Sequence, residues 1–170
     1  SNAQKGIELL SQGDIFLQKP KGRYISKRNI KHIDIETVKK GTILVPGQGT
    51  LGENEIFARA KFAWGYLENK LVAGHVVRFT PNDKVPSGYL YAVLSSKFFL
   101  RLFRNTVYGT NLLGFIIPML EELPIPRLAS GTEKEIDSIV KKAYNYYTKA
   151  NKKEDKAIEL IEKEMASWQN

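Results

Sequence analysis

The sequence predicts an α+β fold, in which a mixed-sheet domain over residues 4–130 is followed by one long C-terminal α-helix over residues 131–170. Composition indicates the helix, because no Gly or Pro occurs after Gly131. Short β-branched runs that alternate with Gly/Pro-containing turns indicate the sheet. The charge divides at the same place. Residues 131–170 hold eight basic and eight acidic side chains, so the net charge of +8 lies in residues 1–130.

The first part of the chain predicts short elements. We expect a helical or irregular opening over residues 6–17, a strongly basic loop over residues 19–31 and a turn of helix over residues 34–40. The apolar run from Thr42 to Val45 ends at Pro46, as a buried strand does. Further strands are expected at residues 56–64 and 71–79.

The period of the apolar residues changes in the next part. Between Ser87 and Arg104 they recur at helical spacing, which predicts one helix. We expect a polar loop at residues 108–114. An extended segment is expected at residues 123–126, because each Pro there drives the preceding residue out of the α region. Thr132, with Glu135 three residues later, matches a capping box and predicts the start of the terminal helix.

The composition favours an anionic partner and a reducing compartment. A pI near 9.5 points to DNA or RNA before a membrane; a basic protein without such a partner is the alternative. Cysteine is absent, which leaves no disulfide framework and no thiolate metal site, so we expect a cytoplasmic protein. No apolar run approaches the roughly 18 residues of a membrane span, so no membrane partner is expected.

Basic and polar side chains form two candidate clusters for DNA contact. The first holds Lys21, Arg23, Tyr24, Lys27 and Arg28, and the second holds Arg104, Tyr108 and Asn111, with Gln48 of a Gly-rich loop as a further candidate. Lys and Arg neutralise phosphates, Arg can bind guanine bidentately, and Asn or Gln can bind adenine in the same way. The alternatives are a solvated loop for the first cluster and a loop-shaping role for Asn111 and for the glycines beside Gln48.

No catalytic arrangement is evident, so we expect no enzyme activity, no cofactor and no metal. Residues 47–52 match the dinucleotide-binding pattern G-x-G-x-x-G, but neither a following helix nor a ribose-binding acid accompanies them. Glu68 and Lys70, with Asp34 upstream, are the candidates for a metal-dependent nuclease, and a surface turn explains them better. His32 and His75 belong to no Ser-His-acid pattern.

Small and apolar side chains recur every seven residues along the terminal helix. One register holds Ile136, Ala143, Ala150 and Ala157, and a second holds Val140, Tyr147, Ile161 and Trp168, with Glu154 interrupting it. Such a seam pairs helices, and small residues let them approach closely. About 38 residues of helix span roughly 57 Å, more than the ~35–40 Å width of a domain of this size. We therefore expect the helix to project and pair. Folding back on its own domain is the alternative.

An ordered set of segments resembles one known family. They are residues 41–45 with Gly47, Gly49 and Gly52, then 76–82, 88–96, Asn111-Leu112 and 120–126, and last the terminal helix. From about Gly13 to Trp168, the chain resembles one repeat of the DNA-specificity (S) subunit of type I restriction-modification systems. Such a repeat is a target-recognition domain followed by a spacer helix.

The resemblance implies a non-catalytic recognition module. In such subunits two target-recognition domains each read one half of a split DNA site, and two antiparallel spacer helices set the gap between the halves. Adenine methyltransferase (M) subunits dock on the assembly, and a separate restriction (R) subunit cuts. The partners implied for this chain are therefore double-stranded DNA, M subunits, indirectly the R subunit, and a second S repeat or a second copy of this chain through the helix.

The chain departs from the family by holding a single repeat. It could be a piece of a longer S subunit, a half-subunit that dimerises, or a piece of a methylase-fused protein. In addition, Glu133-Lys134-Glu135 stands where the family usually has a Gln near the start of the spacer helix. A different class stays open as the alternative: a protein–protein scaffold or assembly module whose basic face is incidental.

Overall fold

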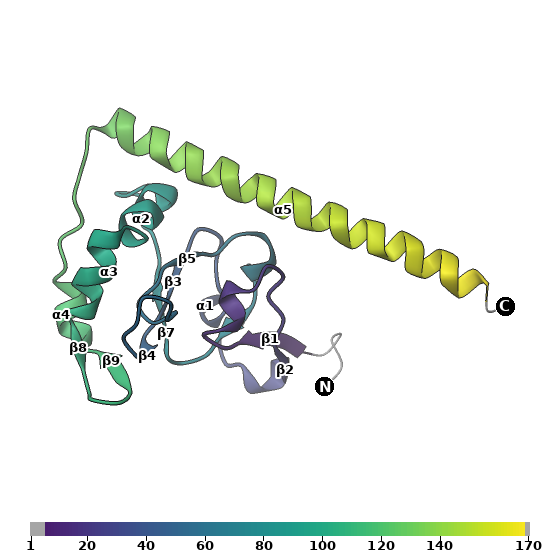
Figure 1. Ribbon diagram of the computed structural model, residues 1–170, viewed down its shortest axis with the longest axis horizontal. Coiled ribbons are helices and arrows are strands. Elements are labelled where there is room, and N and C mark those ends of the chain that lie inside the picture. Colours follow the sequence, from purple (N-terminus) through teal and green to yellow (C-terminus); the bar gives the residue numbers. More distant parts are fainter. Residues whose placement is uncertain (1–5, 169–170) are drawn as a thin grey trace.

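Three small three-stranded sheets and several short helices precede the long helix α5 (Ser130–Ser167) in the computed structural model, which describes residues 6–168 (Figure 1). The predicted α+β class, with one long terminal helix, is confirmed. The predicted mixed sheet is divided into three parts, of which only the first combines parallel and antiparallel pairs.

The first sheet has the order β2-β1-β6 and is built from β1 (Gly6–Leu10), β2 (Arg23–Ser26) and β6 (Leu71–Val72). Strand β1 pairs antiparallel with β2 and parallel with β6. The predicted helical or irregular opening at residues 6–17 is therefore wrong over β1, although a 3-10 turn, η2 (Asp14–Phe16), does follow. The buried Glu8 explains the error, because a carboxylate inside a strand hides the apolar pattern.

The second sheet has the order β5-β3-β7 and is antiparallel, with β5 (Lys61–Phe62), β3 (Ile43–Pro46) and β7 (Val76–Phe79). Strand β3 is buried along its whole length, as its apolar run predicts. The single strand predicted at residues 71–79 is instead two strands of different sheets. The chain turns between them, where the Val76 N–H donates to the Ala73 carbonyl at 2.9 Å. Of the strand predicted at residues 56–64, only β5 forms.

The third sheet has the order β4-β9-β8 and is antiparallel, with β4 (Gln48–Gly49), β9 (Leu113–Phe115) and β8 (Val107–Tyr108). Strands β8 and β9 form a hairpin where a loop was predicted. Gly109 makes the turn possible. Its φ of +106° is disfavoured for other residues, and an added Cβ would lie 2.6 Å from the Leu112 carbonyl oxygen.

Short helices connect and cover these sheets. They are η3 (Lys27–Asn29), α1 (Ile33–Glu36), η4 (Gly65–Leu67), α2 (Ser87–Leu94), α3 (Lys97–Arg104) and α4 (Ile117–Glu121). The one helix predicted between Ser87 and Arg104 is two, because the Ser96 hydroxyl accepts from the Phe99 N–H and starts a new helix there. The larger core cluster lies between these helices and the second sheet. At its centre the Phe62 ring lies 5.1–5.2 Å from the rings of Trp64, Tyr91 and Tyr144.

Helix α5 begins at a carboxylate clamp. The buried Glu133 accepts from the Leu128 N–H at 2.9 Å and from two nitrogens of Arg127 at 2.8 and 2.9 Å. These bonds hold the pKa of Glu133 down at about 2. The N-cap residue is Ala129, so the predicted capping box of Thr132 and Glu135 is wrong. Glu133 instead ties the first turn of the helix to the segment before it.

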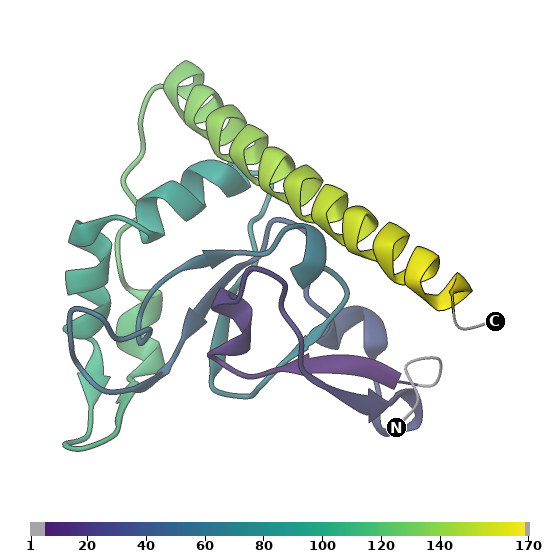
Figure 2. The ribbon, with the colours of Figure 1, turned by 45° about the vertical axis from the view of Figure 1, so that its right-hand side comes forward.

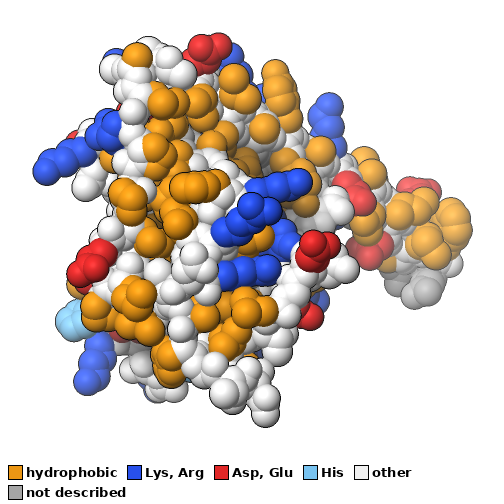
Figure 3. Space-filling view, turned by 60° about the vertical axis from the view of Figure 1, so that its left-hand side comes forward, with side chains coloured by type: hydrophobic (Ala, Val, Ile, Leu, Met, Phe, Trp, Pro, Cys, Tyr) orange, Lys and Arg blue, Asp and Glu red, His pale blue; other side chains and the backbone are white. Residues whose placement is uncertain are grey.

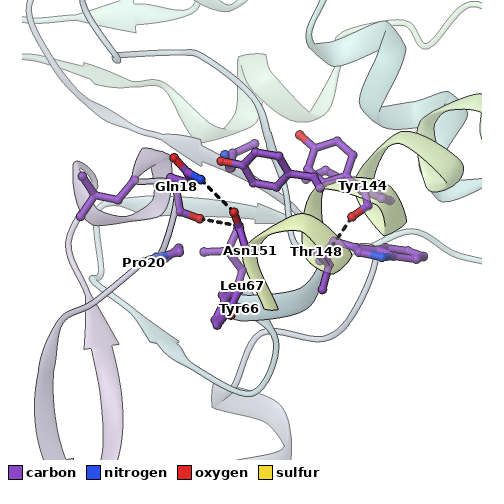
Figure 4. A pocket seen from close by; sticks show the side chains of 12 residues that line it. Gln18, Pro20, Tyr66, Leu67, Tyr144, Thr148 and Asn151 are labelled. Carbon is purple, nitrogen blue, oxygen red and sulfur yellow. Dashed lines mark hydrogen bonds between the residues drawn. The ribbon is translucent and has the colours of Figure 1, made fainter. Parts of the chain in front are cut away.

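The first part of α5 lies along its own domain, and the last part extends past it (Figures 1 and 2). Near the start, the Asp137 carboxylate accepts from the Gly88 N–H at 2.7 Å, and α2 packs closely there. Near the middle, the Gln18 amide donates to the Asn151 side-chain carbonyl at 2.9 Å (Figure 4). Lys19 then pairs with Glu154 and Asp155 at 2.5 and 2.6 Å. Residues 156–168 are exposed. The helix therefore packs back on its own domain over its first part, and projects over its last part.

Candidate nucleic-acid interface

Strand β2 is the edge of the first sheet and carries the first basic cluster. Arg23 and Tyr24 are exposed on it, and Lys21 is exposed just before it. The Ser26 hydroxyl accepts from the Arg28 N–H at 3.4 Å and starts the 3-10 turn η3, on which Lys27 and Arg28 are exposed. An edge strand that ends in a turn therefore exposes the whole first predicted cluster along one edge of the sheet.

A buried ion pair holds this edge in position. The Lys70 ammonium pairs with the Glu8 carboxylate, which also accepts from the Gly22 N–H at 2.7 Å. Gly22 approaches β1 so closely that an added Cβ would lie 2.1 Å from the Leu9 carbonyl oxygen. Glu8 and Gly22 therefore fix the backbone on which Lys21 and Arg23 stand.

No ion pair among residues 6–168 neutralises the charges of this cluster. Among residues 6–168, five exposed cations of this region have no ion-pair partner: Lys21, Arg23, Lys27, Arg28 and Lys31. Lys19, which belongs to the same basic stretch of sequence, is instead bound to the acids of α5. Because exposed unpaired cations attract polyanions over a Debye length, this surface, which we call the β2 basic edge, is suited to phosphate contact.

The β8–β9 hairpin presents the second predicted cluster in part. The Tyr108 side chain is 63% exposed, and Asn111 is exposed in the turn. The Tyr108 ring lies over Gly114 of the paired strand, where an added Cβ would be 3.3 Å from it. The hairpin tip therefore offers an aromatic face and an amide to a ligand, both common in contacts to nucleic-acid bases.

Gln48 lies in strand β4, and its backbone makes two hydrogen bonds with the side chain of Gln12. The Gln12 amide donates to the Gln48 carbonyl at 3.0 Å and accepts from the Gln48 N–H at 3.1 Å. Gln48 is half-buried, opposite Gly114 of β9. No motif marks Gln12, which sequence reasoning missed, although it ties the end of the first sheet to the third.

Arg104 has a structural role. Its Nη2 donates to the Gly52 carbonyl at 2.7 Å, and its buried Nε has no hydrogen-bond partner among the described residues. Arg59, whose Nε donates to the Glu55 carbonyl at 2.7 Å, holds the same loop. Arg104 is half-buried and bonded to the Gly52 carbonyl, so it helps to shape this loop.

The β8–β9 hairpin and β2 lie at opposite ends of the lower side of the domain, both below α5 (Figures 1 and 2). Figure 3 views the domain from the side that holds α3, α4 and the hairpin. There a group of Lys and Arg side chains lies at the centre, with hydrophobic side chains around it. The domain therefore presents basic and apolar groups together, with the long helix leading away from them.

The predicted pairing residues divide between two sides of α5. Val140 packs against the domain core, and Ile136 is half-buried. The others are exposed, namely Ala143, Tyr147, Ala150, Ala157 and Ile161. Four further exposed apolar residues extend them into one stripe along the helix: Ile139, Tyr146, Met165 and Trp168. Trp168 belongs to the second predicted register. Sequence reasoning missed Ile139, Tyr146 and Met165, because a strict seven-residue register drifts around a 3.6-residue helix.

The possible catalytic groups are structural or isolated. Gly47 and Gly49 of the G-x-G-x-x-G match serve packing, because an added Cβ on either would lie 2.9 Å from a neighbouring atom. Glu68 accepts from the Gly65 N–H, and Lys70 belongs to the ion pair with Glu8. Across residues 6–168, no group of three or more His, Cys, Asp or Glu side chains could hold a metal.

No helix in the described part of the chain combines the length and apolarity needed to cross a membrane. A comparison with protein-family models finds no match to this chain, and a comparison with curated proteins finds none either.

Proposed function

We propose that this chain is a non-catalytic module for sequence-specific recognition of double-stranded DNA, of the type that forms one repeat of a type I specificity subunit. It reads one half of a split site. In the cytoplasm it guides adenine methylation by M subunits, and indirectly cleavage by an R subunit. A second repeat, in another copy or another chain, reads the other half.

The observation that carries the proposal is the β2 basic edge. Five exposed cations without a carboxylate partner among the described residues lie on one edge of the domain. In addition, Tyr108 and Asn111 are exposed on the β8–β9 hairpin, which lies at the other end of the domain from β2 in Figure 1. Phosphate contacts give affinity and orientation, and contacts to base edges give sequence preference. The β2 basic edge supplies cations for phosphate contacts, and the hairpin supplies Tyr108 and Asn111 for contacts to base edges.

The exposed stripe of α5 supports the pairing part of the proposal. It runs from Ile139 to Trp168, and Trp168 is 71% exposed. Contiguous exposed apolar stripes on a helix commonly mark a partner-binding face. Because the first turns of α5 are clamped to the domain by Glu133 and Asp137, a paired helix would hold two domains at a fixed separation.

A salt titration tests DNA binding. Affinity for a random duplex is expected to fall steeply with salt, with a log–log slope of about −4 to −5 if all five cations of the β2 basic edge neutralise phosphates. Fluorescence anisotropy at several salt concentrations measures the slope. Binding that is absent at low salt, or a slope near zero, contradicts the proposal and favours the scaffold alternative. Magnesium-dependent cutting by the chain alone would instead reveal a nuclease.

A further inference from the structure

Lys61 of β5 lines an open cavity beside α5. The cavity has a volume of about 340 Å³ and is lined by Lys61, Ala143, Tyr144 and Tyr147. Ala143 and Tyr147 belong to the predicted pairing residues, so the cavity opens onto the exposed stripe of the helix. A partner packed on this stripe would cover it.

The Lys61 ammonium has no carboxylate partner among residues 6–168. The ammonium nitrogen lies 6.0 Å from the centre of the Phe16 ring. The Tyr144 hydroxyl donates to Tyr91 at 2.9 Å and so has its proton engaged elsewhere. Burial lowers the pKa of Lys61, which means that its surroundings do not compensate the charge. A half-buried cation without a counter-charge favours a ligand that brings a carboxylate.

Glu154 is the residue that interrupts the pairing register of α5. Its carboxylate contacts Lys19 at 2.5 Å and is half exposed. Lys19 also lies 2.6 Å from Asp155, so it keeps a carboxylate if Glu154 turns away. Glu154 is therefore able to serve a second cation at no loss of a partner for Lys19.

The small residues of α5 are arranged symmetrically about Ala150. Ala143 and Ala157 each lie seven residues from it. If two copies of α5 pair antiparallel with a twofold axis at Ala150, each Ala143 faces the partner's Ala157. The partner's Glu154 then faces residue 146, in the same helical turn as Ala143 and Tyr147, which line the cavity.

We propose that the occupant of the stripe is a second copy of this chain, paired antiparallel about Ala150, and that the partner's Glu154 enters the cavity to form an ion pair with Lys61. The symmetry produces this ion pair twice. The proposal rests on the helix pairing of the proposed function and names the partner: self-pairing, with a charge contact between domain and partner helix that accounts for both the unpaired Lys61 and the interrupting Glu154.

Charge reversal tests this contact. Lys61→Glu and Glu154→Lys should each raise the dissociation constant of the dimer by about tenfold or more, because each places like charges together at both contacts. A 1:1 mixture of the two variants should dimerise like the wild type, since both contacts in the mixed dimer again join Lys and Glu. Sedimentation velocity on tagged and untagged chains distinguishes the mixed dimer. Lys156→Glu is the matched control. It lies two residues from Glu154 and so on the other side of the helix, and it should change the constant by less than about twofold.

Circular dichroism melting shows whether each variant is folded, and the milder pair Lys61→Gln and Glu154→Gln replaces any variant that is not. Each single Gln variant and the variant with both substitutions should lose a similar amount of dimer affinity, because the two residues share one contact. A monomeric wild type, a mixture that fails to dimerise, or additive Gln effects would overturn the proposal. If that occurs while the chain selects a DNA half-site, the proposed function stands and the self-pairing contact alone is wrong. If the mixed dimer is rescued but selects no half-site, the self-pairing contact stands and the proposed function is wrong.

Discussion

A single carboxylate determines where the long helix starts. Glu133 is buried, and its bonds to Arg127 and to the Leu128 N–H connect the first turn of α5 to the segment before it. Single residues also determine which basic side chains stay exposed without an ion pair. Lys19 and Arg23 belong to one basic stretch of sequence, yet Lys19 binds Glu154 and Asp155, whereas Arg23 is exposed on β2 without an ion pair among the described residues. Which cation remains for a ligand depends on such partners, and no local pattern shows them.

The clamp at Glu133 predicts an acid-sensitive helix start. The folded pKa of Glu133 is about 2, below its ordinary value of 4.5, so the stabilisation is complete above pH 4.5 and is lost as the pH falls toward 2. Glu133→Gln should therefore lower the urea midpoint clearly at pH 6 and progressively less as the pH approaches 2. Urea unfolding over this pH range measures it, with the exposed Glu135→Gln as the control. An equal cost at both ends of the range contradicts the role of the carboxylate.

Arg23 provides a second test at the residue scale. If it neutralises a phosphate, Arg23→Ala should weaken binding to all duplexes and reduce the salt slope by about 1. If it also reads guanine, preference at one position should relax, with a loss of about 1–3 kcal/mol for the preferred site. Lys163→Ala, an exposed basic residue near the far end of α5, is the matched control and should leave affinity unchanged. Equal effects of the two substitutions would mean that binding depends only on net charge.

At the scale of elements, strong local patterns predicted the structure well. The apolar run of β3 and the Gly- and Pro-free segment of α5 both formed the expected element. Patterns that were weak, or that spanned two elements, did not predict the structure. Strand β1 contains the buried Glu8, whose partner Lys70 is far away in sequence, and the helix predicted over residues 87–104 is divided by the cap at Ser96. Tertiary contacts decided these cases, and the sequence alone does not display them.

The β2–β1 pair depends on the close approach at Gly22. Gly22→Ala should destabilise the domain by about 1–3 kcal/mol, because the new Cβ would lie 2.1 Å from the Leu9 carbonyl oxygen and must push the strands apart. It should also weaken DNA binding, since Lys21 and Arg23 flank it. Gly74→Ala is the matched control, because its Cβ would meet no atom within 4 Å. Urea unfolding and anisotropy measure the two effects. Equal stability of the variants would contradict the packing argument.

Substitutions on opposite sides of α5 should have different effects on helix pairing. Ala150→Arg places a long charged side chain in the middle of the exposed stripe, so it should abolish helix pairing and leave the domain folded. Ala166→Arg, an exposed alanine on the other side of the helix, should leave pairing intact. Sedimentation and thermal melting give the two readouts. Pairing that survives Ala150→Arg would place the contact elsewhere on the molecule.

On the scale of the whole molecule, two surfaces face different ways. The hairpin and β2 lie at opposite ends of the lower side of the domain, while α5 lies above them and extends past the domain (Figure 1). The fold is an α+β domain followed by one long helix, as the sequence predicted. The side chains that would read bases were less predictable. Of the second cluster Tyr108 and Asn111 are displayed, whereas Arg104 is bound to Gly52.

The most direct test of the central claim is selection from a random duplex pool, followed by sequencing of the bound fraction. The sample should be the wild-type chain, paired as a dimer or assembled with methyltransferase subunits. We predict enrichment of one short half-site of a few base pairs, which the variant Arg23→Glu with Arg28→Glu fails to enrich although its helix still pairs. A wild-type sample that is paired, yet enriches no sequence at any salt concentration, would contradict the claim that this chain reads DNA.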